Sequence, residues 1–280
     1  TVVFLLLALG SAVVYGVGDW FGGRAARHQA SLVVVVVGQA VSLVLVAGAT
    51  GLGDAGSPDT STWLWSAAGG VIGALGIVSL YHGFATGAVT VVAPVSAVVS
   101  ALVPVAGGLL IGERPSGLAL AGIAVAVVAI GLVSGAVGRR DASSLRSVLV
   151  AVAAGTCFGL LFLCLERTAD GSGMWPLLIA RFASVPLLLA LVVAGRQRPV
   201  APGTGLRIAV LAGVFDMGAN VLYLLAVREG LMSIVAVVVS LYPASTVAMA
   251  FAVDRERVTR WQSVGLGLAA AALVLVSAAH

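Results

Sequence analysis

Three charged side chains fall inside long apolar runs of the sequence: Asp19, Arg181 and Asp216. Asp216 lies deepest, in "GVFDMGANVLY", at a position where an aspartate costs roughly 2.5 to 3.5 kcal/mol to insert into a bilayer. Ionisable residues at such positions mark substrate, ion or proton pathways. We therefore expect Asp216 to face a wet cavity, where it takes a proton or a substrate amine. The alternative is a structural ion pair with Arg181 that joins the two helices.

The residues that follow Asp216 extend its polar face. Asn220 and Tyr223 stand at i+4 and i+7, so a helix places all three side chains in one stripe. Arg181 lies roughly 10 Å along its own helix, too deep for easy contact with the headgroups. We expect it to neutralise Asp216 or Asp19, because an unpaired buried charge is costly. The alternative is that Arg181 binds a substrate carboxylate. An amino acid would then place its amine at the acid and its carboxylate at Arg181.

Asp19 precedes a basic cluster in "YGVGDWFGGRAARH", and a helix places it on the same face as Tyr15, four residues earlier. Two interpretations stay open at about equal weight. In the first, the carboxylate is a gate or a cation contact near the mouth of the cavity, with Tyr15 beside it. In the second, it is an interfacial carboxylate paired with Arg24 near the headgroups.

Three prolines mark points where helices bend. Pro94 and Pro104 share one apolar run, and Pro243 lies in another. A proline has no N–H to donate, so it frees a carbonyl inside a helix and permits a kink. We expect these three residues to serve as gating positions where two helix bundles rock against each other.

The composition identifies the solvent that surrounds these residues. Hydrophobic residues make up 60% of the 280, charged residues make up 9%, and the mean hydropathy is +1.15. A soluble domain of this size needs about a quarter of its residues charged. We conclude that the chain is a multi-pass membrane protein whose partner is the lipid bilayer. The net charge of +4 comes from arginines between apolar runs, which is typical of membrane anchors and argues against nucleic acid binding.

Apolar runs long enough to cross a bilayer recur along the whole chain. A helix needs roughly 20 residues to span the hydrocarbon core, and only helices satisfy their own backbone there without forming a barrel. The sequence predicts ten such spans, at residues 2–22, 30–50, 63–85, 89–112, 116–137, 146–166, 174–195, 206–227, 232–253 and 260–279. All five tryptophans fall at the ends of these spans, where the indole ring prefers the headgroup layer.

The sequence also repeats itself at an offset of 143 residues. This offset aligns residues 87–134 with residues 230–277, and it superposes Glu113 on Glu256 and Arg114 on Arg257. The same offset pairs Tyr15 with Phe158 near the start of each unit. We therefore predict two five-helix units, at residues 1–137 and 144–280. An odd number of spans inverts the second unit relative to the first, as in many transporters.

The chain resembles the EamA-type members of the drug/metabolite transporter superfamily. The resemblance rests on "GERPSGLALAGIAVAVVAIGLV", its partner "DRERVTRWQSVGLGLAAAALVLV", the opening "YGVGDWFGGRAAR" and the ten-span repeat. The second unit departs from the pattern, because Arg255 stands where the first has Gly112. The resemblance implies a central cavity lined mainly by helices 1, 3, 4, 6, 8 and 9, with helices 5 and 10 packed together at one edge.

These observations favour a secondary active transporter that exports small organic metabolites, such as amino acids, related compounds or drugs, by alternating access. The alternatives are an uptake permease of the same fold and a membrane scaffold that transports nothing. A coupled proton is a candidate partner. We expect no enzyme activity, no catalytic residue, no cofactor and no metal, because His28, His82 and His280 are scattered without ligand spacing.

The expected location is the inner, or plasma, membrane. Most arginines outside the spans lie in the odd-numbered connections, and only Arg114, Arg167 and Arg228 lie in the even-numbered ones. The positive-inside rule then places both termini outside the cell. The family resemblance favours termini inside, so the orientation stays open.

Overall fold

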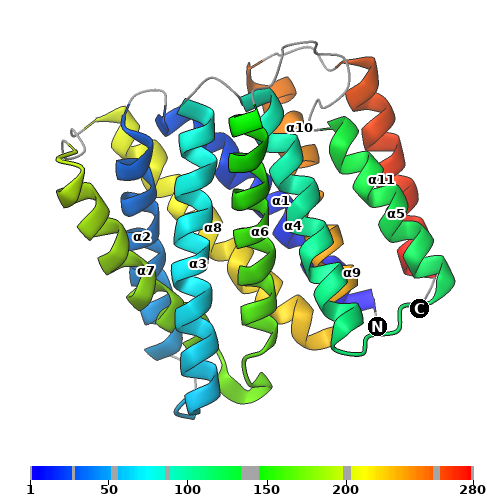
Figure 1. Ribbon diagram of the computed structural model, residues 1–280, viewed down its shortest axis with the longest axis horizontal. Coiled ribbons are helices and arrows are strands. Elements are labelled where there is room, and N and C mark those ends of the chain that lie inside the picture. The colour runs from blue at the N-terminus through cyan, green and yellow to red at the C-terminus, as the bar shows by residue number, and fades with distance from the viewer. Residues whose placement is uncertain are drawn as a thin grey trace.

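The computed structural model describes residues 2–26, 29–51, 56–85, 89–133, 145–197, 203–254 and 259–278. Their regular structure is helical throughout (Figure 1). The α-helices are α1 (Val2–Ala26), α2 (Ser31–Gly51), α3 (Thr60–Ala85), α4 (Val89–Leu110), α5 (Gly117–Val133), α6 (Leu145–Glu166), α7 (Trp175–Ala194), α8 (Thr204–Glu229), α9 (Met232–Val239), α10 (Tyr242–Asp254) and α11 (Arg260–Ala278). A short 3-10 helix, η1 (Asp170–Ser172), joins α6 to α7.

The helices have the length and composition of a multi-pass membrane protein. Within the described residues, seven segments are long and apolar enough to cross a bilayer. One of them, Met232–Val253, contains both α9 and α10. Three shorter apolar helices, Val95–Leu110, Gly117–Leu132 and Arg260–Leu275, fall on the other predicted runs. Both termini lie at the lower edge of the molecule in Figure 1, which is called the terminal edge below.

The surface of the protein is apolar, unlike that of a water-soluble protein. Large apolar side chains such as Leu110 and Val193 are 87% and 76% exposed. Some hydroxyl groups are buried, and several of these bond to carbonyls of neighbouring helices, as Ser11 Oγ does to the Ala219 oxygen at 2.8 Å. A lipid solvent explains both observations, because the bilayer accepts apolar side chains and leaves polar groups to find partners inside the protein.

The predicted span at residues 232–253 is present as the apolar segment Met232–Val253, but it is not one continuous helix. α9 ends at Val239 and α10 begins at Tyr242, with Ser240 and Leu241 forming a turn between them. Pro243 explains the break, because it has no N–H to donate to the Val239 carbonyl four residues earlier. In contrast, α4 continues through both Pro94 and Pro104.

Close helix crossings hold the bundle together on both sides of its centre. A Cβ atom added at Gly213 of α8 would lie 2.7 Å from the Gly38 Cα of α2, and one added at Gly70 of α3 would meet the Ala180 carbonyl of α7. Small residues allow such backbone approach in membranes, where van der Waals contact drives helix association. α5 and α11 pack on each other at one side of the bundle, as the family resemblance implies (Figure 1).

Candidate functional site

A central cavity lies among the helices. It is bordered by Tyr15 and Asp19 of α1, Gln39 of α2, Gly69, Gly73, Ile77 and Leu80 of α3, Ser100 of α4, Phe158, Leu161 and Phe162 of α6, Arg181 of α7, Asp216 and Asn220 of α8, and Tyr242 of α10. Its volume is about 80 Å³, enough for roughly five waters or a small solute. The lining includes helices 2 and 7, which the resemblance did not imply.

Arg181 and Asp216 form an ion pair in this cavity. Arg181 Nη2 lies 2.9 Å from Asp216 Oδ2, and the two side chains are 6% and 29% exposed. Ser42 Oγ also donates to Asp216 Oδ2, at 3.4 Å. The Arg181 Nε atom is buried without a hydrogen-bond partner in the described residues. The pair therefore holds α7 to α8 while one edge of its carboxylate stays accessible.

Asn220 supports the Asp216 carboxylate from one turn further along α8. Its Nδ2 atom donates to the Asp216 carbonyl at 2.8 Å and lies 3.4 Å from Asp216 Oδ1. Asn220 is almost fully buried, yet it lines the cavity. The side-chain amide thereby fixes the rotamer of the acid that it follows.

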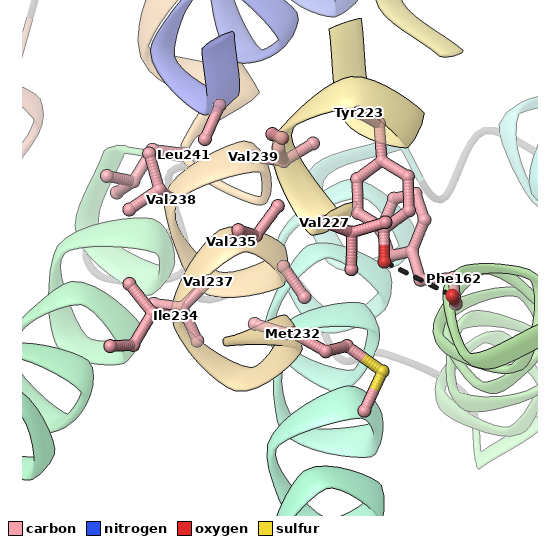
Figure 2. Close-up of a cluster of buried hydrophobic side chains, with 14 of the residues drawn as sticks. Phe162, Tyr223, Val227, Met232, Ile234, Val235, Val237, Val238, Val239 and Leu241 are labelled. Carbon is pink, nitrogen blue, oxygen red and sulfur yellow. Dashed lines mark hydrogen bonds between the residues drawn. The ribbon is translucent and has the colours of Figure 1, made fainter. Parts of the chain in front are cut away.

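Tyr223, the third residue of the predicted stripe, lies away from the cavity. Its side chain is completely buried and its ring stacks on Phe162, with centroids 4.3 Å apart. Its hydroxyl donates to the Phe162 carbonyl oxygen at 3.2 Å, as the dashed line in Figure 2 shows. Tyr223 therefore belongs to the buried layer between the cavity and α9, together with Val227 and Met232.

Asp19 is the other acid of the cavity. Its side chain is exposed, and it borders both the central cavity and a second, smaller one between α1, α2 and α8. No hydrogen bond or ion pair reaches its carboxylate from the described residues. Arg24 does not pair with it, and its guanidinium lies over the Trp20 ring at 4.7 Å. Tyr15 lines the cavity beside Asp19, with its ring centroid 6.4 Å from that of Tyr242.

The prolines lie at different distances from this site. Pro243 follows the cavity residue Tyr242 directly and marks the break between α9 and α10. Ser240, in the break, approaches the cavity residue Ser100 with 3.5 Å between the hydroxyl oxygens. Pro104 is buried further along α4. Pro94 belongs to α4 by its backbone, and its side chain lies outside the described part of the structure.

Two functional features were missed from the sequence. Gln39 lines the cavity and accepts a hydrogen bond from Ser184 Oγ at 2.9 Å. The sequence indicated it only as the single amide side chain in an apolar run. Glu113 was noticed only as a repeated residue. Its carboxylate accepts bonds from the Met232 amide at 2.6 Å and the Ser233 amide at 3.1 Å, so it caps α9. Glu256, its counterpart in the repeat, lies outside the described residues.

The local chain geometry explains how Glu113 reaches α9. α4 ends in a Schellman motif, in which the Glu113 amide donates to the Gly108 carbonyl at 2.9 Å and the Gly112 amide to Leu109 at 3.3 Å. Gly112 has a φ of 101°, which a residue with a side chain rarely adopts. The motif turns the chain at the terminal edge and presents the Glu113 carboxylate to the N-terminus of α9, where the helix dipole favours a negative charge.

A second contact braces the same edge. Arg228, near the end of α8, donates to the Gly173 carbonyl at 3.0 Å and to Ser172 Oγ at 3.1 Å in the connection between α6 and α7. Glu113 thus ties the end of α4 to the start of α9, and Arg228 ties the end of α8 to the connection between α6 and α7. The fully buried α9 and the Phe162–Tyr223 stack fill the space between these contacts and the cavity.

Comparisons with known proteins agree with this architecture. The sequence pattern of the EamA-like transporter family matches residues 3–135 and again residues 145–278. No curated protein sequence matches the chain. A solved structure described only as "Crystal structure of protein" superposes with a TM-score of 0.78 over 98% of this chain and 96% of its own, at 12% identity, and it therefore shares the fold.

Proposed function

Because the chain belongs to the EamA-like transporter family, we propose that it is a secondary active transporter that exports a small organic solute by alternating access. The observation that carries this proposal is the central cavity, with its Arg181–Asp216 pair and the Asp19 carboxylate inside membrane helices. A scaffold has no need of such costly groups in lipid, since apolar side chains would serve it as well. The proposed location is the plasma membrane, with the solute as the transported partner.

We further propose ten spans in two inverted units, residues 1–137 and 144–280. Pairs of helix contacts related by the repeat support this arrangement: α1 packs on α8 as α6 packs on α3, and α2 packs on α8 as α7 packs on α3. The close crossings agree, since Gly70 and Gly213 are 143 residues apart and each meets the helix that the repeat assigns to it. Figure 1 supports the inversion, because α1 begins at the terminal edge and α6 ends there.

Alternating access requires a cavity that closes on one side at a time. The Phe162–Tyr223 stack, the buried α9 and the bonds of Glu113 and Arg228 form a seal toward the terminal edge. Asp19 lies on the other side of this seal and is exposed. The break between α9 and α10 lies next to the cavity, where a change of backbone angle at Ser240 and Leu241 would open the seal.

Uptake by the same fold is the alternative to export. Both directions use the same cavity, because gradients and coupling, not the cavity itself, set the net direction. If a proton is coupled, Asp19 and Asp216 are the residues of this cavity that would carry it.

A thermal-shift screen in detergent tests the proposal without assuming a substrate. The purified chain is heated with amino acids, nucleosides, cationic drugs or organic acids, because a ligand that binds only the folded state raises the melting temperature. We expect one class to stabilise the wild type and to lose this effect in Asp216→Asn. Asp170→Asn, a change at an exposed carboxylate outside the cavity, is the matched control. A stabilisation that survives Asp216→Asn in full would contradict the proposed binding role.

A further inference from the structure

The central cavity is lined by residues that the repeat relates to one another. Four pairs that differ by 143 in number all border it: Tyr15 and Phe158, Asp19 and Phe162, Gly73 and Asp216, and Ile77 and Asn220. In every pair, one member carries a polar group and the other does not. The two units have therefore diverged at the same four positions of the cavity.

The polar members share one side of the cavity. Tyr15 and Asp19 belong to α1, and Asp216 and Asn220 belong to α8, which packs directly against α1. These four residues form the polar wall.

The apolar members share the other side. Gly73 and Ile77 belong to α3, and Phe158 and Phe162 belong to α6, which packs directly against α3. These four residues form the apolar wall. A cavity with one polar and one apolar wall fits a solute that has a polar head and an apolar body.

The net charge of the cavity lining depends on which of its charged groups are already paired. In the part of the chain that the structure describes, three charged side chains border the cavity, and two of them, Arg181 and Asp216, neutralise each other at 2.9 Å. The carboxylate of Asp19 has neither a hydrogen bond nor an ion pair within the described chain. Among the described residues, the lining of the whole cavity therefore carries one negative charge in excess.

Resting on the proposed transport function, we propose that the substrate is an amphipathic organic monocation. Its cationic head lies at the Asp19 carboxylate, in the cavity that Tyr15 and Tyr242 also line, and its apolar body lies on the apolar wall. The faces of aromatic rings attract cations, and the carboxylate supplies the opposite charge.

The same geometry disfavours the other charge classes. An organic anion would meet Asp19 and Asp216 as like charges. The carboxylate of a zwitterion needs the Arg181 guanidinium, which Asp216 already occupies. A carboxylate on the ligand therefore competes with Asp216 for Arg181, and this lowers its net affinity.

Three probes with one apolar body and different charge test the proposal: 2-phenylethylammonium, phenylalanine and 3-phenylpropanoate. Their dissociation constants for the purified full-length chain are measured by titration calorimetry. We expect the cation to bind at least roughly tenfold more tightly than the zwitterion and the anion. The tightest binding by phenylalanine or 3-phenylpropanoate, or binding of none of the three, would overturn the substrate class.

Variants at Asp19 test its role in this selectivity. We expect Asp19→Asn to weaken binding of the cation by roughly tenfold and Asp19→Glu, which keeps the charge, to retain most of it. Asp170→Asn, with its carboxylate outside the cavity, is expected to bind as the wild type does. Equal binding in Asp19→Asn and Asp170→Asn would contradict the assignment of the head group to Asp19.

The apolar wall has its own test. A Cβ added at Gly73 would lie 3.0 Å from a terminal carbon of the Leu161 side chain, so Gly73→Ala fills space in the cavity and demands only a small shift. We expect it to weaken binding of 2-phenylethylammonium while methylammonium, which has no apolar body, is unaffected. Failure of the transport proposal can be distinguished from failure of the substrate class. In that case the cavity would bind the cation but would be accessible from one side of the membrane only.

Discussion

The Arg181–Asp216 pair is the contact whose removal has the most predictable effect on stability. Asp216→Asn keeps a hydrogen-bond acceptor but removes the charge that lies 2.9 Å from a guanidinium with 6% exposure. The Coulomb energy at this distance is roughly 6 kcal/mol for an effective dielectric constant of 20. Because Asp216 stays 29% exposed and the asparagine still accepts a bond, we expect a net loss of about 2 to 3 kcal/mol in the free energy of unfolding.

A double-mutant cycle separates this pair from the general effect of each substitution. The free energy of unfolding is measured in mixed micelles by titration with a denaturing detergent, for Asp216→Asn, for Arg181→Gln and for the double variant. We expect the double variant to lose about 2 kcal/mol less than the sum of the single variants, because each single change strands the remaining charge. Asp170→Asn should change stability by at most about 0.5 kcal/mol. Single losses below about 0.5 kcal/mol, or strictly additive losses, would refute the reasoning.

Three other substitutions test parts of the account. Glu113→Gln should lower the free energy of unfolding by about 1 kcal/mol, measured in the same titration, because it replaces the charged cap of α9 by a neutral one; no change would mean that the cap is not used. Gly213→Ala should lower the free energy of unfolding by about 1 to 3 kcal/mol, because its Cβ would lie 2.7 Å from the Gly38 Cα. Gly48→Ala is the control, since a Cβ at Gly48 would meet open space. Equal stability of the two variants would contradict the close crossing of α2 and α8. Tyr223→Phe should lose about 1 kcal/mol, because it removes the hydrogen bond from the Tyr223 hydroxyl to the Phe162 carbonyl. It should leave the dissociation constant of 2-phenylethylammonium unchanged, because Tyr223 does not border the cavity, and weakened binding would place it in the site.

The helices were predictable because apolar runs of about 20 residues have one stable form in lipid. The break in the ninth run was not predictable from the sequence. Pro243 indicated a weak point, but a proline in a membrane helix is compatible with a kink or with a complete break. α4 shows the other outcome, since it continues through two prolines.

The polar stripe of α8 was predicted correctly as a helical face but not as a site. Tyr223 stands seven residues after Asp216, which keeps it on the same face but moves it about 10 Å along the helix. That distance takes Tyr223 out of the cavity and into contact with Phe162. Helical periodicity gives the direction of a side chain. How far a cavity extends along the helix is determined by the helices that pack around it.

The partners of the three charged residues also depend on the fold. The sequence left Arg181 with two possible acids and Asp19 with two possible roles. The structure pairs Arg181 with Asp216, and Arg24 lies over Trp20 instead of beside Asp19. The choice between partners depends on how the helices pack, and the spacing of residues within one helix does not reveal this packing.

The central claim is that the cavity becomes accessible from each side of the membrane in turn. It is tested with Ile77→Cys, a position that lines the cavity, in a chain whose Cys157 and Cys164 are replaced by serine. A membrane-impermeant maleimide is applied to vesicles of each orientation, with Asp170→Cys, at an exposed position in the connection between α6 and α7, as the control that reports orientation. The account predicts labelling of residue 77 from both faces, and labelling from one face only would contradict it.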